Sequence, residues 1–272
     1  MLVDLHVHTT ASDGLDNPRD VVCKAKKLNL KAIAITDHDT FGGLQEALQA
    51  TETVNMEVVT GIELSAEYKG KEVHILGYLM DIMDKDLAYH LSFFKKSRVE
   101  RVHKIVQKLQ QLNLPICKDE VLSQAEYGII GRPHIARVLI NKGVVGSVGE
   151  AFDKYIGQDG MAFVPRVKYT PAKAIRLIRN AGGVAVIAHP GLAKLDNYIP
   201  RLVEEGLQGI EVYHPQHSQV DIDHYLYMAR QYELLVTGGS DYHGPDARGH
   251  ETLGTATVSY HVVKEIYNLA GS

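Results

Sequence analysis

The 272-residue chain contains no tryptophan, only two cysteines, five phenylalanines and nine prolines. Cys23 and Cys117 lie far apart and form no CxxC pattern, which favours two free thiols in a reducing cytoplasm. No apolar run approaches the roughly 18 residues of a membrane span. The first residues, MLVDLHVHTT, contain neither a basic n-region nor an apolar h-region, so we expect no signal peptide and a cytoplasmic location.

The chain also lacks a strong charge of either sign. Its formal net charge is −4, which argues against non-specific binding to duplex DNA. A composition of 45% hydrophobic and 23% charged residues is typical of a globular protein. The length of the chain suits one large domain, or a barrel-sized domain with an insert. Histidine is the residue in excess, because its 14 copies outnumber both the prolines and the phenylalanines.

Short β-like runs and helical patterns alternate along most of the chain. Asn17 followed by Pro18, and Thr170 followed by Pro171, are typical helix starts. This alternation indicates an α/β protein with a mostly parallel sheet, either a small β/α barrel of seven strands or an open doubly wound sheet. The seven expected strands are residues 2–8, 31–36, 57–64, 71–78, 184–188, 209–213 and 235–238.

The middle of the chain breaks this alternation with helical patterns at residues 86–114, 131–143 and 147–156. We therefore expect a barrel formed by residues 1–84 and 166–272 and a helical insertion domain at 85–165. Residues 85–168 contain 14 Lys and Arg against 8 Asp and Glu, a net charge of +6, so the rest of the chain carries −10. This insert either grips an anionic substrate or presents a solvated helix face. The basic residues of the first helix are Lys95, Lys96, Arg98, Arg101, Lys104 and Lys108.

Histidines and carboxylates recur where the expected strands end. His6 and His8 are two residues apart on a strand, so both imidazoles point to the same side. A lone strand-end histidine is more often structural than a ligand, but the carboxyl ends of parallel strands converge on one place. The recurrence therefore predicts a site for several metal ions. The further strand-end residues are Asp13, Asp37, His38, Asp39, Glu63, His74, His189, Asp241 and His243.

This series of motifs resembles the PHP (polymerase and histidinol phosphatase) family of metal-dependent phosphoesterases. The resemblance rests on an HxH opening, TDHDT, a strand glutamate, AHP and a closing SDxHG, and it spans the α/β body. It implies a distorted seven-stranded barrel with three divalent ions, most often manganese, iron or zinc. Imidazole and carboxylate ligands together favour the same metals over calcium or magnesium. The implied ligands are His6, His8, Glu63 and Asp241 for one ion, Glu63, His74 and His189 for the second, and Asp13, His38 and His243 for the third.

The charges of such a centre point to phosphate ester hydrolysis. Three divalent ions contribute +6, whereas Asp13, Glu63 and Asp241 contribute −3 and a bridging hydroxide −1. The remaining charge of about +2 complements a phosphate monoester dianion, so we expect in-line attack by a metal-bridging hydroxide. Glu63, His189 and Asp241 are expected to take a direct part in catalysis. No Ser-His-Asp, Walker or cysteine-nucleophile motif competes with this interpretation. Asp37 and Asp39 either orient ligands or cap a turn.

The insert contains GRPHIARVL, where Arg132 and His134 begin a predicted helix. A helix start and an arginine fork both favour a bound phosphate, although Arg132 could instead pair with a surface carboxylate. GRPH and a later FVP resemble a PHP subgroup of nucleoside 3′,5′-bisphosphate phosphatases and of similar enzymes that trim short RNA from its 5′ end. We expect His217 to contact the same substrate and Lys168 to be a weaker candidate. His214 and His224 are expected on the surface.

The expected reaction converts a nucleoside 3′,5′-bisphosphate into the nucleoside 5′-monophosphate and phosphate, with manganese as the first choice of metal. One alternative is a 5′→3′ exoribonuclease acting on short RNA. A second is a phosphatase for histidinol phosphate or another small monoester, and a third is a metal-binding module without catalytic activity. The expected partner is a nucleotide or short oligoribonucleotide, not duplex DNA or a membrane.

Overall fold

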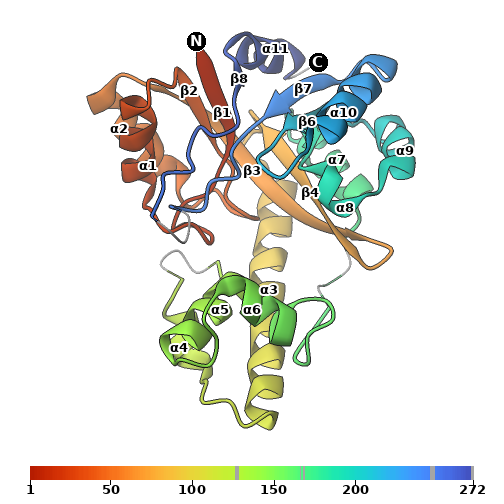
Figure 1. Cartoon of the computed structure of the whole chain (residues 1–272). Helices are drawn as coiled ribbons and strands as arrows, with labels where there is room; N and C mark the ends of the chain where they lie inside the picture. The colour runs from red at the N-terminus through yellow and green to blue at the C-terminus, as the bar shows by residue number, and fades with distance from the viewer. Residues whose placement is uncertain (126–128, 166, 168, 246–248, 271–272) are drawn as a thin grey trace.

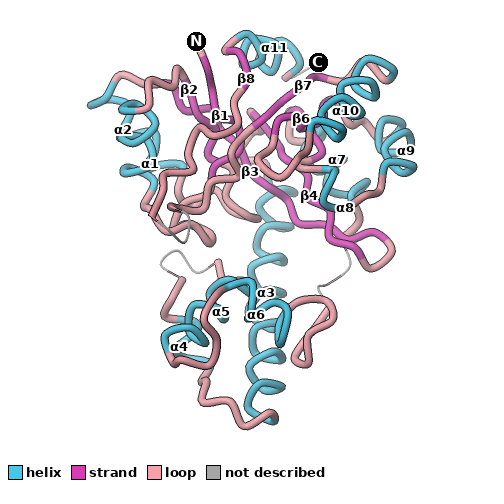
Figure 2. Tube along the Cα trace, in the orientation of Figure 1, coloured by secondary structure: helices cyan, strands magenta, loops and turns pink. Residues whose placement is uncertain are grey.

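The computed structural model of the chain describes residues 1–125, 129–165, 167, 169–245 and 249–270. An α/β body contains both chain ends, and a smaller helical body lies on its opposite side (Figure 1). The strands gather in the α/β body, whereas the smaller body consists of helices and loops (Figure 2). One long helix, α3 (Lys85–Gln111), runs through both bodies.

Eight strands form a single curled sheet in the order β7-β6-β5-β4-β3-β2-β1-β8. The expected α/β barrel is confirmed in class, with β1 to β7 at the seven expected positions and β8 in addition. Strand β8 has only two residues, too few for a recognisable period, and pairs antiparallel to β1. The strands are β1 (Leu2–Val7), β2 (Ala32–Ile35), β3 (Glu57–Tyr68), β4 (Lys71–Tyr78), β5 (Val184–Ile187), β6 (Gly209–Tyr213), β7 (Leu235–Gly238) and β8 (Val258–Ser259).

The sheet is buried on both faces, which explains its nearly continuous apolar strands. In β2, Ala32 and Ala34 pack among the inward-facing side chains of the barrel. Ile33 and Ile35 point the other way, into the core shared with α1 (Pro18–Lys27) and α2 (Leu44–Val54). Small residues thus fill the narrow interior and larger ones fill the layer under the helices.

Strand β4 runs antiparallel to both of its neighbours, β3 and β5. The expectation that the metal-site residues follow the carboxyl ends of parallel strands is therefore wrong for His74 in β4. His74 lies in the first half of β4, opposite Ser65 in the last third of β3. Reversing the strand brings its beginning, rather than its end, to the edge where the neighbouring parallel strands finish.

The two ends of the sheet approach each other beside β1. The His8 N–H donates to the Tyr242 carbonyl at 2.8 Å, and Val7 forms an isolated bridge with Tyr242. The segment that follows β7 therefore lies against the end of β1. This contact brings the first and last histidine motifs of the chain together.

Helices surround the barrel and begin where the sequence predicts. Asn17 accepts a hydrogen bond from the Asp20 N–H at the start of α1, and Thr170 accepts one from the Lys173 N–H at the start of α7. These side chains satisfy N–H groups that the first turn leaves without a partner. The other helical segments of the α/β body are α7 (Pro171–Asn180), α8 (Pro190–Ala193), η2 (Asp196–Tyr198), α9 (Ile199–Glu204), α10 (Gln219–Gln231) and α11 (His261–Leu269).

The smaller body has a hydrophobic core of its own. Helix α3 serves both bodies, because Leu87 and Phe94 pack in the barrel core whereas Ile105 and Leu109 pack in the insert core. The division between the two cores therefore falls inside α3. The remaining helices of the insert are α4 (Lys118–Leu122), α5 (Arg132–Asn141), α6 (Val148–Ala151) and the π-helix η1 (Phe152–Ile156).

Candidate metal centre

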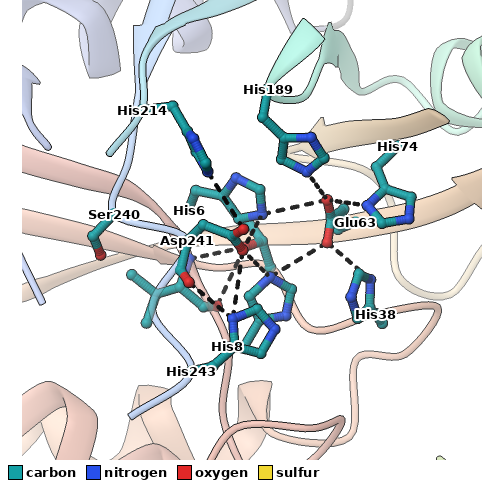
Figure 3. A network of polar contacts seen from close by, with 12 residues as sticks. His6, His8, His38, Glu63, His74, His189, His214, Ser240, Asp241 and His243 are labelled. Atoms are coloured by element: carbon teal, nitrogen blue, oxygen red, sulfur yellow. Dashed lines mark hydrogen bonds and ion pairs between the residues drawn. The ribbon is translucent and has the colours of Figure 1, made fainter. Parts of the chain in front are cut away.

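The structure brings all nine predicted metal ligands into one cluster at the edge of the barrel that faces the insert. Their ligand atoms form four overlapping groups, and within each group all atoms lie within 4.8 Å of one another. The residues of this cluster, which we call the metal centre, are His6, His8, Asp13, His38, Glu63, His74, His189, Asp241 and His243. Figure 3 labels all of them except Asp13.

Glu63 lies at the middle of the metal centre and is completely buried. One carboxylate oxygen is 2.9 Å from His74 Nδ1 and 3.1 Å from His189 Nε2. The other is 2.8 Å from His38 Nδ1 and 3.3 Å from His8 Nε2 (Figure 3). A carboxylate whose two oxygens face different sets of imidazoles is suited to bridge two ions.

Asp241 and Asp13 face the remaining imidazoles. Asp241 Oδ1 is 3.4 Å from His6 Nε2 and 3.2 Å from His8 Nε2. Asp13 Oδ1 is 3.3 Å from His243 Nε2. Asp13 follows β1 and Asp241 follows β7, so the loops after these two strands close this side of the metal centre.

Two residues of the metal centre have backbone conformations that L-residues seldom adopt. His189 has φ = 27° and Asp241 has φ = 50°. Two residues before Asp241, the backbone of Gly239 passes close to His6. A Cβ atom added to Gly239 would lie 2.4 Å from the backbone nitrogen of His6, so only glycine fits there. Strain of this kind persists only where the surrounding contacts enforce it, and it is frequent at functional sites.

Buried polar atoms without partners indicate that the residues of the metal centre suit a group of cations. Several of their nitrogens and oxygens are buried and, within the described ranges of the chain, have no hydrogen-bond partner. Buried polar atoms in that state are costly, and a shared ion would satisfy them together. The atoms are His6 Nε2, both ring nitrogens of His8 and of His74, His38 Nδ1, Glu63 Oε2 and Asp13 Oδ1.

The electrostatics of the metal centre also favour positive charge. Burial opposes the charge of His8, but the nearby carboxylates of Asp241 and Glu63 raise its pKa to about 10. Burial likewise opposes ionisation of Glu63, yet the imidazoles of His38, His74 and His6 hold its pKa well below the ordinary value. The carboxylates therefore stay ionised, and the space between them attracts cations.

The PHP domain family matches residues 4–195, which is most of the chain. The chain belongs to the PHP family. It is a metal-dependent phosphoesterase of that family, as the resemblance of its motifs predicted.

Three characterised relatives of this PHP protein span nearly the whole chain. It is 33% identical over 247 residues to a 5′-3′ exoribonuclease of Haemophilus influenzae, covering 89% of this chain and 90% of the relative. It is 32% identical over 255 residues to a 3′,5′-nucleoside bisphosphate phosphatase of Chromobacterium violaceum, covering 92% and 90%. It is 35% identical over 260 residues to a phosphoribosyl 1,2-cyclic phosphate 1,2-diphosphodiesterase of Eggerthella lenta, covering 91% and 96%.

A solved structure from Bifidobacterium adolescentis, whose proposed activity is that of a metal-dependent phosphoesterase, has the same fold. The TM-score is 0.92 at 32% sequence identity, over 98% of this chain and 96% of that one. The substrates named for the three relatives differ, although each is a phosphate ester. Family membership therefore establishes the reaction class and leaves the substrate of this PHP protein as a separate question.

Two buried residues that the sequence analysis did not select support the metal centre. Glu211 accepts from His6 Nδ1 at 3.0 and 3.2 Å and from the His189 N–H at 2.8 Å. It thereby orients His6 so that Nε2 faces the other ligands. The signal for this role was the repeated GIE, which lies in the middle of β3 and at the start of β6 and carries Glu63 and Glu211 as its third residue.

His214 is the second of these residues, and the expectation that it lies on the surface is wrong. It is 5% exposed. Its Nδ1 accepts from the Gln216 N–H at 3.2 Å, so Nε2 carries the proton and donates to Asp241 Oδ2 at 3.4 Å (Figure 3). The HP pair at His214, which repeats the HP pair at His189, was the signal in the sequence. His224 is half-exposed and pairs with Asp196 at 3.3 Å, as a surface residue does.

Asp37 and Asp39 tie loops together at the rim of the metal centre. Asp37 accepts from the Thr9 N–H at 2.8 Å and from the Ser12 hydroxyl at 2.6 Å, which holds the loop that carries Asp13. Asp39 accepts from the Ser65 N–H and pairs with Arg98 at 2.6 Å. Asp39 therefore links the barrel to α3.

The basic residues of α3 form two sets, which lie on different sides of the helix. Lys95, Lys96, Lys104 and Lys108 are exposed, which agrees with a solvated helix face. Arg98 and Arg101 instead turn toward the barrel, with side chains only 10% and 9% exposed. The helical period thus places the lysines on the solvent-exposed face of α3 and the two arginines on the face toward the metal centre.

A pocket of about 390 Å³ lies between the barrel and the insert. His74 and His189 of the metal centre line one part of it, and Arg101, Arg132 and Phe163 of the insert line another. It therefore joins the two bodies of the chain directly beside the predicted ligands.

The three predicted substrate contacts lie in different surroundings. Arg132 lines the pocket and pairs with Glu72 at 2.7 Å. His134 is buried, and its Nδ1 accepts from the Gly131 N–H at 3.1 Å. His217 is buried between β6 and α8, where Nδ1 donates to the Val212 carbonyl at 2.8 Å and Nε2 accepts from the Gly191 N–H at 3.2 Å.

Lys168, the weaker phosphate candidate, lies outside the described residues. None of the described helices is both long enough and apolar enough to cross a membrane.

Proposed function

We propose that this PHP protein hydrolyses a nucleoside 3′,5′-bisphosphate at its 3′-phosphate, with a nucleoside 5′-monophosphate and phosphate as products. The observation that carries the proposal is the pocket of about 390 Å³ in which His74 and His189 lie opposite Arg101 and Arg132. It offers a metal centre for one phosphate and a pair of guanidinium groups for another. A pocket of this size suits one small ligand.

Three divalent ions would be held by the nine residues of the metal centre, with manganese as the first choice and iron or zinc as alternatives. When bound, these ions supply a nucleophilic hydroxide and neutralise charge on the phosphate. Glu63, His189 and Asp241 are the residues to which we assign direct catalytic roles. Glu63 and Asp241 would contribute negative charge to the metal centre, and Glu211 holds the backbone of His189 by accepting a hydrogen bond from its N–H.

The residues of the chain would act mainly by binding and orientation. Arg132 and Arg101 would bind the 5′-phosphate through planar N–H forks, which suit phosphate oxygens. His214 would hold the Asp241 carboxylate in place through its Nε2–H. In the overall reaction, a water oxygen bonds to phosphorus, the bond from phosphorus to the 3′-oxygen breaks, and that oxygen leaves as a hydroxyl after taking up a proton.

The test is incubation of the manganese-loaded protein with adenosine 3′,5′-bisphosphate. We expect AMP and one equivalent of phosphate, and we expect a chelator to stop the reaction. Histidinol phosphate and a phosphoribosyl 1,2-cyclic phosphate serve as competing substrates. A higher kcat/KM for either of these than for the bisphosphate would contradict the proposed substrate.

A 5′→3′ exoribonuclease is the second candidate, and the exposed lysines of α3 favour it because they could follow an RNA backbone beyond the pocket. It predicts stepwise release of mononucleotides from a 5′-phosphorylated RNA tetramer, at a rate that falls steeply with salt. Glu63→Gln addresses the remaining alternative, a metal-binding module. Such a module would lose metal in this variant but would have no turnover to lose.

A further inference from the structure

A carboxylate from the barrel contacts two guanidinium groups of the insert. Glu72 is the second residue of β4, and its two oxygens accept from Arg132 Nη2 at 2.9 and 2.7 Å. Arg101 Nη1 is 3.9 Å from the same carboxylate. Glu72 therefore lies where an anion bound by both arginines would lie.

The position of Glu72 along β4 relates this anion position to the metal centre. Glu72 and His74 are two residues apart on a strand, so their side chains point to the same side, about 7 Å apart along the chain. Both line the pocket between barrel and insert. A ligand that replaced the Glu72 carboxylate would thus extend from the arginines toward the metal centre.

The two arginines are oriented by contacts within the insert. Arg101 Nε donates to the Val164 carbonyl at 2.8 Å. The Arg132 guanidinium lies 4.9 Å from the centre of the Phe152 ring, and its Nη1 donates to the Ile156 carbonyl at 3.4 Å. These contacts keep the forks in position whether the acceptor is a carboxylate or a phosphate.

We propose that Glu72 is a specificity-determining residue that competes with the second phosphate of the substrate for Arg101 and Arg132. This inference rests on the proposed function. A terminal phosphate carries close to two negative charges, whereas Glu72 and an internal phosphodiester carry one each. Only the terminal phosphate has a clear electrostatic advantage over the resident carboxylate. Glu72 thereby selects a substrate with two terminal phosphates and returns to the arginines when the product leaves.

The experiment measures binding of AMP to the manganese-loaded protein by calorimetry, because AMP carries the 5′-phosphate and lacks the 3′-phosphate that would be hydrolysed. We expect Glu72→Gln to tighten AMP binding about tenfold, which is the scale of one charge-assisted hydrogen bond. Glu72→Ala should act in the same direction, because the charge matters rather than the amide. Combining Glu72→Gln with Arg132→Met should remove most of the gain.

The matched control is Glu120→Gln, which removes a carboxylate from an ion pair with Lys142 on the surface of the insert. This variant should bind AMP as the wild type does. Unchanged or weaker AMP binding in both Glu72 variants would overturn the inference, as would absence of AMP binding in every variant. Thermal unfolding of each variant checks that it is folded.

The outcome separates this inference from the proposed function. If the wild type hydrolyses the bisphosphate and Glu72→Gln does not tighten AMP binding, the role of Glu72 fails and the proposed function stands. If AMP binding tightens and the bisphosphate is not hydrolysed, the proposed function fails and the competition by Glu72 stands.

Discussion

Two buried glutamates, Glu63 within β3 and Glu211 within β6, differ in what they contact. Glu63 faces imidazoles on every side, whereas Glu211 contacts one imidazole, that of His6, and one backbone N–H. Both are 0–1% exposed, so each depends on its partners to remain ionised. At the scale of single residues, one carboxylate is suited to bind ions directly and the other to orient a ligand.

Replacing Glu211 should therefore weaken metal binding without abolishing it. In Glu211→Gln the amide oxygen can still accept from His6, but the loss of the charge makes His6 a poorer ligand. We expect manganese affinity to fall about 10- to 100-fold, as for other residues that orient metal ligands. Manganese titration followed by metal analysis measures the change. The control is Glu205→Gln, whose carboxylate pairs with Arg176 on the surface and should leave metal binding unaltered. Equal affinities in all three proteins would remove Glu211 from this role.

Among the elements, β4 and α5 decide how the insert meets the barrel. Reversed strand β4 carries both Glu72 and His74, so one strand contributes to the pocket and to the metal centre. Helix α5 begins with Arg132 at the pocket and with His134 in the interior. The two residues Arg132 and His134 in GRPH thus differ in their surroundings, with the arginine at the pocket and the histidine buried in the packing.

His134 makes the stability of the protein depend on pH. Burial lowers its pKa from 6.5 to about 4. The unfolded chain therefore takes up a proton near pH 6.5, whereas the folded chain resists it until about pH 4. The stabilisation is fully present above pH 6.5 and is lost as the pH falls toward 4, by about 3 kcal/mol in total.

Urea unfolding at pH 7.0 and pH 4.5 tests this effect. The free energy of unfolding of His134→Gln should fall by about 2 kcal/mol less than that of the wild type between these two pH values. His224→Gln, at a half-exposed histidine, is the control and should follow the wild type. An identical loss of stability in all three proteins would show that His134 is not a source of the pH dependence.

In the whole molecule, α3 contributes side chains both to a core of the barrel and to the core of the insert. The barrel brings its ligands together from strands across the full length of the chain. Bringing ionised carboxylates and unpaired ring nitrogens into one buried cluster destabilises the folded state unless cations are present. Metal binding and folding are therefore coupled.

Removal of metal should lower the melting temperature. An ion at 100 times its dissociation constant stabilises the folded state by about 2.7 kcal/mol, which for a chain of this size corresponds to several degrees. We expect chelation to lower the melting temperature and added manganese to restore it. Glu63→Gln should respond weakly to manganese, since it lacks the central ligand. A wild-type melting temperature unaffected by chelator and by manganese would contradict the coupling.

The sequence predicted much of this arrangement. Seven strands and the helix starts at Pro18 and Pro171 could be read from local patterns, because strand period and capping depend on neighbours along the chain. The nine residues of the metal centre were implied by the resemblance of the strand-end motifs to the PHP family. Strand β8 was too short for such a pattern. Glu211 and His214 repeat motifs that were assigned to Glu63 and His189, but a single carboxylate or histidine is a weak signal without its contacts.

The sequence by itself determined which residue types stand at the strand ends, and with them the family and the class of reaction. Only the tertiary structure decided the direction of β4, the inward turn of Arg98 and Arg101, and the pairing of Glu72 with Arg132 across 60 residues. The physical reason is the range of the interactions. Periodicity and capping act between neighbours, whereas strand pairing and ion pairing act between residues that only the complete fold brings within a few ångströms.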